Sequence, residues 1–187
     1  MKVIQLHKNE SALIKKALKN NRDAQHTLFE EYAPKMLSVC RYYIKDIQQA
    51  EEAMLNGFYK VFTSLKNYRS EGSFEGWIRR IMVRESISYL RGKKTFEFGV
   101  EDLIAEDDSN NNIEVNMGVA EIQQLIDDLP EGYKMVFIMY AIEGYKHHEI
   151  AEMLHISEGT SKSQLFKARK LLQVKIKELN KTSYGAN

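Results

Sequence analysis

The chain has 187 residues, and its hydrophobic content of 43% is enough for one large domain or two small ones with true cores. Its two prolines and ten glycines favour a mostly helical protein. The single cysteine, Cys40, excludes an internal disulfide, and no segment has the apolar run of a membrane span or a signal peptide, so we expect a cytoplasmic protein without direct membrane insertion.

The net charge of +1 hides a strong asymmetry along the chain. Residues 1–92 hold 16 Lys and Arg against 10 Asp and Glu, a net charge of +6. Residues 93–130 hold 2 against 10, a net charge of −8, and residues 131–187 hold 9 against 6, a net charge of +3. Two basic modules therefore flank an acidic segment, and this distribution is more informative than the sum.

Residues 11–91 are predicted to form helices joined by short corners. Apolar positions recur at helical spacing over residues 11–20, 23–43 and 46–65. Pro34 interrupts the second of these segments, so it either kinks one helix or occupies the first turn of a new one. The third segment is expected to bury a stripe of apolar residues: Ala50, Met54, Phe58, Val61, Phe62 and Leu65.

A basic helix with interleaved aromatic residues follows a loop at residues 66–73. Ser73 is placed to cap this helix, which covers residues 74–91. Six cations lie on it or just after it: Arg79, Arg80, Arg84, Arg91, Lys93 and Lys94. Four aromatic residues lie in and around the same segment: Tyr68, Phe74, Trp77 and Tyr89. This combination suits single-stranded nucleic acid, because cations follow the backbone and rings stack on unpaired bases. Core packing explains Phe74 and Trp77 at least as well.

Residues 95–119 are acidic and rich in asparagine, with no sustained periodicity. They predict a flexible linker between two helical domains. Helical patterns return at residue 121, and Pro130 separates a short helix from another over residues 131–143.

Residues 144–172 predict a helix-turn-helix. Its first helix covers residues 147–154, and Ser157 is the expected N-cap of a second helix that ends near residue 179. His155 lies at the corner between them, where such turns often need a positive φ. Histidine adopts that conformation more readily than a β-branched residue does.

The second helix of this motif has two different faces. Its inward face is expected to contain Ser161, Leu165, Ala168 and Leu172. Its opposite face carries small polar residues, cations and one aromatic residue: Lys162, Ser163, Phe166, Lys167 and Lys170. A helix in the DNA major groove needs such a face, because polar side chains read base edges and cations meet phosphates. An ordinary helical hairpin with a solvated basic face is the alternative.

The two modules together resemble bacterial RNA polymerase sigma factors of the extracytoplasmic-function (ECF) group, over about residues 10–178. The segment LPEGYKMVFIMYAIEGYKHHEIAEMLHISEGTSKSQLFKARKLL (129–172) is similar to region 4, which reads the −35 promoter element. The segments AEEAMLNGFYKVF (50–62) and GSFEGWIRRIMVRESISYLR (72–91) are similar to region 2, which holds core polymerase and opens the −10 element. The resemblance implies an all-α protein with a region 2-like domain (10–94), an acidic linker (95–119) and a region 4-like domain (120–180).

The resemblance also implies roles for individual residues. The core polymerase-binding residues would be Ala50, Glu51, Glu52, Leu55 and Phe58. The residues that recognise and melt the −10 element would be Tyr68, Phe74, Trp77, Arg79, Arg80, Arg84 and Arg91. The residues that contact the −35 element would be Thr160, Lys162, Ser163, Gln164, Phe166, Lys167 and Lys170, with Ser163 and Gln164 as base readers. The implied partners are core polymerase, promoter DNA and an anti-sigma protein.

Three other interpretations compete with the sigma-factor reading. A conventional helix-turn-helix regulator would explain residues 129–180 but not the basic helix with its aromatic residues. A pure interaction protein without promoter activity is a second alternative. A metal site at His148, Glu152 and His155 is a third, suggested by their i, i+4, i+7 spacing. Because there is no HExxH motif, fourth ligand, activated nucleophile or Gly-rich phosphate loop, we expect no metal, cofactor, catalytic residue or small-molecule substrate, and no enzyme.

Overall fold

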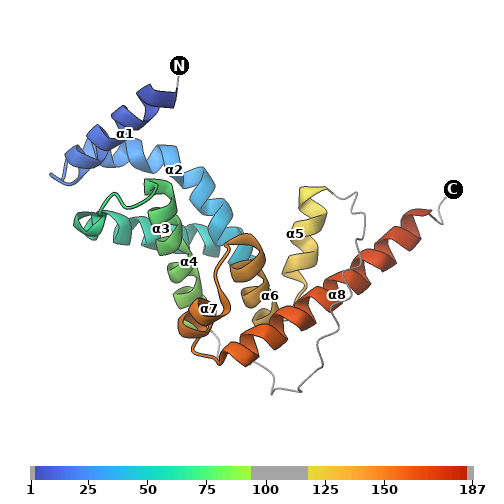
Figure 1. Cartoon of the computed structure of the whole chain (residues 1–187). Helices are drawn as coiled ribbons and strands as arrows, with labels where there is room; N and C mark the ends of the chain where they lie inside the picture. Colours follow the sequence, from blue (N-terminus) through green and yellow to red (C-terminus); the bar gives the residue numbers. More distant parts are fainter. Residues whose placement is uncertain (1–2, 94–117, 185–187) are drawn as a thin grey trace. The chain divides into compact units, whose positions relative to one another are not determined.

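The computed structural model describes residues 3–93 and 118–184, which fall into two compact units that divide between Lys93 and Lys94. Every regular element of these residues is helical, so the predicted all-α fold with two domains is confirmed (Figure 1). The predicted acidic linker lies almost entirely outside the described residues. Each unit is described by itself below.

The N-terminal unit contains four α-helices and one short 3₁₀ helix: α1 (Val3–Ala17), α2 (Arg22–Tyr43), α3 (Ile47–Thr63), η1 (Leu65–Asn67) and α4 (Phe74–Lys93). Side-chain oxygens cap three of these helices. At the start of α2, the side chain of Asn21 accepts a hydrogen bond from the backbone N–H of Ala24 at 2.8 Å. At the start of α3, the side chain of Asp46 accepts one from the backbone N–H of Gln49 at 2.9 Å. The hydroxyl of Ser73 accepts from Gly76 N–H at 3.1 Å, as predicted. Such caps fix where each helix begins.

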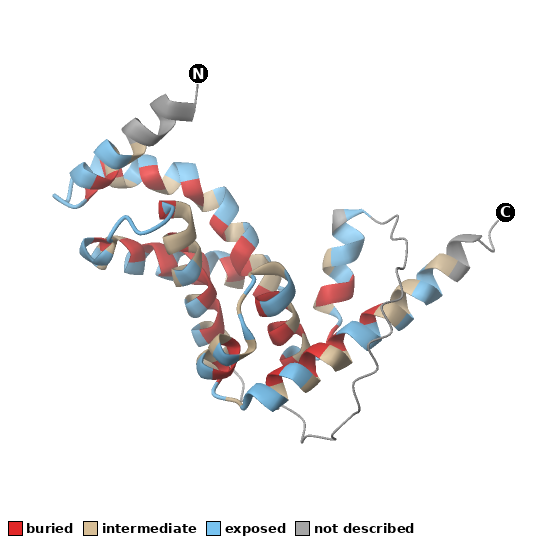
Figure 2. Cartoon of the chain, in the orientation of Figure 1, coloured by how far each residue is buried: buried red, intermediate tan, exposed pale blue. Residues whose placement is uncertain are grey.

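The core of the N-terminal unit lies where α2, α3 and α4 pack on one another, and α1 packs against α2. Figure 2 shows buried residues along the facing sides of these helices. Fully buried side chains include Leu28, Met36, Ile78 and Met82. α3 approaches α4 closely at Gly57, where an added Cβ would meet the Sδ atom of Met82 at 2.3 Å.

Pro34 lies within α2, which continues as one helix from Arg22 to Tyr43. No new helix begins there, so the second of the two predictions for Pro34 is wrong. Pro34 is exposed, and the hydroxyl of Ser38 donates to its carbonyl oxygen at 3.1 Å. A proline inside a helix removes one backbone hydrogen bond and crowds the preceding turn, so Pro34 is a local cost to α2 that the packing of the helix offsets.

The C-terminal unit contains four α-helices and a π-helical turn: α5 (Val119–Asp127), α6 (Glu131–Phe137), η2 (Ile138–Ile142), α7 (His147–Leu154) and α8 (Glu158–Tyr184). Both α6 and α7 pack against α8. The core where α5 joins α8 contains Leu125, Leu129, Ala168 and Leu172. A buried ion pair between Lys134 and Asp127, at 2.9 Å, ties α6 to α5.

The helix-turn-helix is present as predicted. α7 covers residues 147–154, and His155 follows in the left-handed conformation with φ 56° and ψ 47°. The hydroxyl of Ser157 accepts from the backbone N–H of Thr160 at 2.9 Å, which confirms this residue as the N-cap of α8.

Candidate functional site

The inward face of α8 is buried as predicted, at Ser161, Leu165, Ala168 and Leu172. On the opposite face Lys162 and Lys170 are exposed, whereas Thr160, Ser163, Phe166 and Lys167 are half-buried. The hydroxyl of Ser163 donates to the carbonyl oxygen of Thr160 at 3.0 Å. The structure therefore brings six of the seven predicted −35 residues together on the accessible side of α8.

Gln164 is the exception, and its predicted role in reading a base is wrong. Its side chain is 1% exposed and lies among the core residues of the unit. The reason is helical geometry: Gln164 follows Ser161 by three residues and precedes Ala168 by four, so all three share the inward stripe. The role came from the resemblance to region 4, and the outward face predicted from spacing did not include Gln164.

His147 lies where η2, α7 and α8 meet, and residue spacing did not indicate it. Its Nδ1 atom is hydrogen-bonded to the hydroxyl of Ser161 at 2.9 Å, and its ring stacks on that of Tyr140 at 4.6 Å. The guanidinium of Arg169 lies 5.6 Å from the centre of the same tyrosine ring. The pKa of His147 is lowered from its ordinary value by burial first and then by the positive charge of Lys162. Among these residues the sequence marked only Ser161 and Lys162, as members of opposite faces of α8.

The basic helix α4 presents part of its predicted surface to solvent. Arg80 and Arg84 are exposed, while Arg79 and Arg91 are half-buried. Between them, Glu85 forms an ion pair with Lys60 of α3, so the acidic residue of this segment is engaged by the neighbouring helix. Of the four predicted arginines, Arg80 and Arg84 are therefore the two that α4 presents fully to solvent.

The aromatic residues beside α4 form one cluster. The ring of Phe74 lies 5.1 Å from that of Tyr68, 5.8 Å from that of Trp77 and 5.7 Å from that of Tyr32. Phe74 is 1% exposed, so its predicted role in capturing an unpaired base is wrong and it is a core residue. Tyr68 and Trp77, 5.5 Å apart, are half-buried and keep accessible ring surface.

The loop that precedes α4 has a defined conformation. Ser70 and Gly72 both have positive φ, 60° and 98°, and the hydroxyl of Tyr68 donates to the carbonyl oxygen of Gly72 at 3.0 Å. Glycine adopts φ of this kind without a steric cost. The loop is therefore closed on itself beside the two accessible rings.

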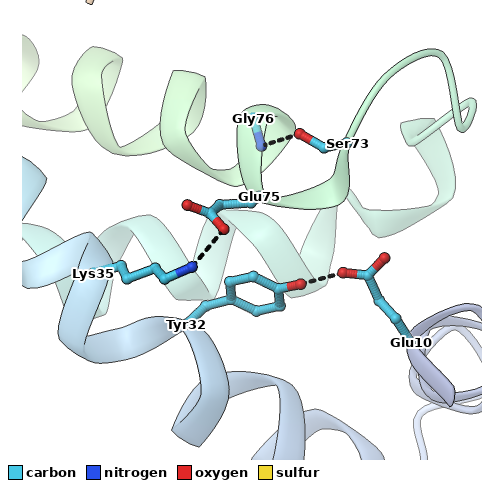
Figure 3. Close-up of polar contacts among 6 residues, drawn as sticks. All are labelled: Glu10, Tyr32, Lys35, Ser73, Glu75 and Gly76. Carbon is cyan, nitrogen blue, oxygen red and sulfur yellow. Dashed lines mark hydrogen bonds and ion pairs between the residues drawn. The ribbon is translucent and has the colours of Figure 1, made fainter. Parts of the chain in front are cut away.

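α1 contributes Glu10 to the same region, a residue that spacing in the sequence did not indicate. The hydroxyl of Tyr32 donates to the Glu10 carboxylate, and Lys35 pairs with Glu75 at 2.8 Å (Figure 3). Burial first, and then the bond to Glu10, raises the pKa of Tyr32 above its ordinary value. Burial and the charge of Glu10 also raise the pKa of Tyr68, which places this carboxylate close to the aromatic cluster.

The exposed side of α3 carries an apolar stripe, defined here as Ile47, Leu55 and Tyr59. These side chains are 49%, 54% and 71% exposed, and the exposed Glu51 lies between the first two. Because the residues are four, eight and twelve positions apart, they lie on one side of the helix. Glu52 is also exposed, and its carboxylate accepts from the hydroxyl of Tyr89 at 2.9 Å. The motif indicated Leu55 but not Ile47 or Tyr59.

Ala50 and Phe58 belong to the opposite side of α3, so their predicted role as direct polymerase contacts is wrong. Both are buried in the core of the N-terminal unit. The ring of Phe58 lies 4.8 Å from that of Phe29 on α2. A sequence motif includes both the residues that pack in the core and the residues that are exposed to a partner, and only the packing of the helix distinguishes the two.

The alternative metal site depended on a single helix that contained His148, Glu152 and His155. α7 ends at Leu154 and His155 has left-handed backbone, so the helical argument fails for the third residue. Within residues 3–93 and 118–184, no three His, Cys, Asp or Glu residues are arranged to hold a metal ion. In the same residues, no helix is both long enough and apolar enough to span a membrane.

Comparison with known proteins assigns both units. Residues 28–96 match the family model Sigma-70 region 2, and residues 120–172 match Sigma-70 region 4. The chain is 26% identical to the ECF RNA polymerase sigma-E factor of Haemophilus influenzae, over 91% of this chain and 96% of that protein. It is 24% identical to the RNA polymerase sigma-H factor of Pseudomonas aeruginosa, over 91% and 95%.

A solved structure shares the fold. The sigma factor RpoE of Bartonella quintana, in complex with the anti-sigma factor NepR, aligns with a TM-score of 0.51 and 14% identity. The alignment covers 79% of this chain and 93% of that one. Because the two family models together match well over half of the chain, with region 2 before region 4, the chain belongs to the sigma-70 family and is a promoter-specific transcription initiation factor of RNA polymerase.

Proposed function

We propose that the N-terminal unit docks on core polymerase and opens the −10 element, while the C-terminal unit places α8 in the major groove of the −35 element. The observation that carries this proposal is the division of α8 into two faces. One face is buried against the rest of its unit, and the other presents Lys162, Lys167 and Lys170 beside small polar residues. A recognition helix of a helix-turn-helix has this division.

At the −35 element we assign phosphate contacts to the three lysines of α8. Ammonium groups neutralise phosphates and release counterions, which gives affinity without base preference. Thr160, Ser163 and Phe166 are the remaining candidates for contact with base edges and thymine methyl groups, because they lie in the first turns of α8 on its accessible side.

At the −10 element we assign the unpaired strand to the cluster beside α4. Tyr68 and Trp77 keep accessible ring surface on which a base can stack, and the closed loop at residues 68–73 holds their surroundings fixed. Arg79, Arg80, Arg84 and Arg91 of α4 would then follow the strand's phosphates. We assign Phe74 a supporting role behind the two accessible rings.

We assign core polymerase docking to the apolar stripe of α3, with Glu51 and Glu52 beside it. Exposed apolar side chains surrounded by polar residues are typical of a protein–protein interface. The charge of the two carboxylates would select a partner surface with basic residues at its rim.

An anti-sigma protein is a further partner that we propose for this chain. It is suggested by the resemblance and by the RpoE structure, in which that sigma factor is bound to NepR. Such a protein would hold the factor inactive by covering its polymerase- and DNA-binding surfaces. We also propose that the chain has no catalytic activity of its own, since chemistry belongs to the polymerase it directs.

The test is run-off transcription with core RNA polymerase on a pool of genomic promoter fragments, with and without this protein. Promoter-specific transcripts that appear only with the protein support the proposal and give its −35 and −10 sequences together. The matched control is the Leu55→Glu variant, which should bind core poorly and yield few transcripts. Stable DNA binding without core, and no transcripts with it, would favour a conventional helix-turn-helix regulator instead.

A further inference from the structure

The ring of His147 is held by contacts from two other elements. It stacks on Tyr140 of η2 at 4.6 Å, with 23° between the ring planes. Its Nδ1 atom bonds the hydroxyl of Ser161, which is fully buried on α8. When the ring is protonated, Nδ1–H donates to Ser161 and the second nitrogen, Nε2, becomes a donor as well. The contacts of the ring therefore accommodate both protonation states without a change of position.

Charged groups of α8 surround this ring. Lys162 and Arg169 disfavour its positive form and Glu158 favours it, while burial disfavours it most strongly. Arg169 is held over the other ring of the stack, Tyr140, at 5.6 Å. On α7 itself, the nearby carboxylate of Glu149 accepts from the backbone N–H of Lys146 at 2.8 Å. In the free protein these effects together hold the pKa of His147 below its ordinary value, which favours the neutral ring.

DNA changes this balance of charge. Lys162, one of the two cations that disfavour a charged His147, is also a residue assigned above to a DNA phosphate. A phosphate at Lys162 offsets the repulsion, and His147 is close enough to respond because it is bonded to Ser161, the residue before Lys162 on α8. We propose that His147 takes up a proton when the helix-turn-helix binds DNA, so that affinity for DNA increases as pH falls. This inference rests on the proposed −35 role of α8, and linkage requires that the two effects be reciprocal.

The experiment measures binding of the full chain to a fluorescein-labelled DNA duplex of mixed sequence, at fixed low salt, from about pH 8 to about pH 5.5, where histidine titrates. The variant His147→Gln removes the titrating ring. The matched control is His148→Gln, which changes the neighbouring exposed histidine of the same helix. A second measurement follows the NMR titration of His147 in the unaltered protein, with and without the duplex, and so does not depend on how the variant folds.

We expect the unaltered protein and His148→Gln to bind about fivefold more tightly at the acidic end, the low end of coupling between two linked sites. His147→Gln should lose this dependence, and the duplex should raise the pKa of His147 in the NMR titration. An unchanged His147 titration, or a pH dependence that persists in His147→Gln and disappears in His148→Gln, would overturn the inference alone. If the free chain does not bind the duplex, the same pH series is measured with holoenzyme on a promoter duplex, and no binding there at any pH would overturn the −35 assignment together with the inference.

Discussion

Gly57 shows how one residue sets the distance between two helices. A Cβ at this position would meet Met82 Sδ at 2.3 Å and Cε at 2.9 Å, and Met82 is fully buried, so its side chain cannot move without disturbing its neighbours. We expect Gly57→Ala to destabilise the N-terminal unit by about 1–3 kcal/mol, the usual cost of overpacking. Urea unfolding measures this loss. Gly92→Ala is the control, because its Cβ meets nothing within 4 Å; equal effects of the two substitutions would contradict the argument.

Lys167 is expected to act on DNA through its charge alone. Lys167→Ala should weaken binding at all promoters and reduce the slope of log affinity against log salt by about one, because one phosphate contact is lost. Holoenzyme binding to several promoters at a series of salt concentrations measures both quantities. Lys177→Ala removes an exposed lysine farther along α8 and should change neither. A loss confined to one promoter would instead make Lys167 a base reader.

His147 also makes the stability of the C-terminal unit depend on pH. Its pKa is lower in the folded chain than in the unfolded chain, so the unfolded state binds more protons once pH falls below about 6.5. The stabilisation is complete above that pH and is lost as pH falls toward the folded value. Thermal unfolding is measured from about pH 7.5 to about pH 5.5, the range in which histidine titrates. Over this range the unfolding temperature should decrease less for His147→Gln than for the unaltered protein.

At the scale of the helix, α3 has one side that packs in the core and another side, the apolar stripe, that is exposed to solvent. Leu55→Glu introduces a charge at an exposed position of the apolar stripe, so we expect the variant to fold normally and to lose most of its co-purification with core polymerase. Leu18→Glu is the control, because Leu18 is similarly exposed, at 44%, but lies outside α3. Loss of binding in both variants would indicate general insolubility, and loss in neither would remove the stripe from the docking surface.

Local signals made the helices predictable from the sequence, whereas the predictions that failed depended on how one helix packs against another. Ser73 and Ser157 are caps whose bonds reach only three residues along the chain, so their positions could be read directly. Whether Phe74 faces a base or the core depends on α2, which approaches it through Tyr32, 42 residues earlier in the sequence. Spacing within one helix contains no information about such a neighbour.

Gln164 and His147 illustrate two further limits. The resemblance to region 4 implied that Gln164 reads a base, but its register on α8 places it with Ser161 and Ala168 on the buried face. His147 depends on a hydrogen bond to Ser161, 14 residues away on another helix, and on stacking with η2. The resemblance to sigma factors supplied the roles of whole segments, whereas individual side chains needed the structure.

At the scale of the whole molecule, the two units have separate cores, and each is assigned a different promoter element. Variants in different units should therefore act independently on promoter binding, since distant sites without shared partners give additive free energies. For Arg84→Ala in α4 and Lys167→Ala in α8, we expect the fold-losses in holoenzyme affinity to multiply to within about twofold in the double variant.

The contrasting pair lies within one unit. Lys167 and Lys170 are three residues apart on the accessible side of α8, so they share one stretch of DNA backbone and their losses should not multiply. Holoenzyme affinities of the three single and two double variants on one promoter, at one salt concentration, give both comparisons. Strong coupling between Arg84 and Lys167 would mean that the two units act on the promoter as one body. Independence there, together with coupling on α8, is what two separately folded DNA-binding units require.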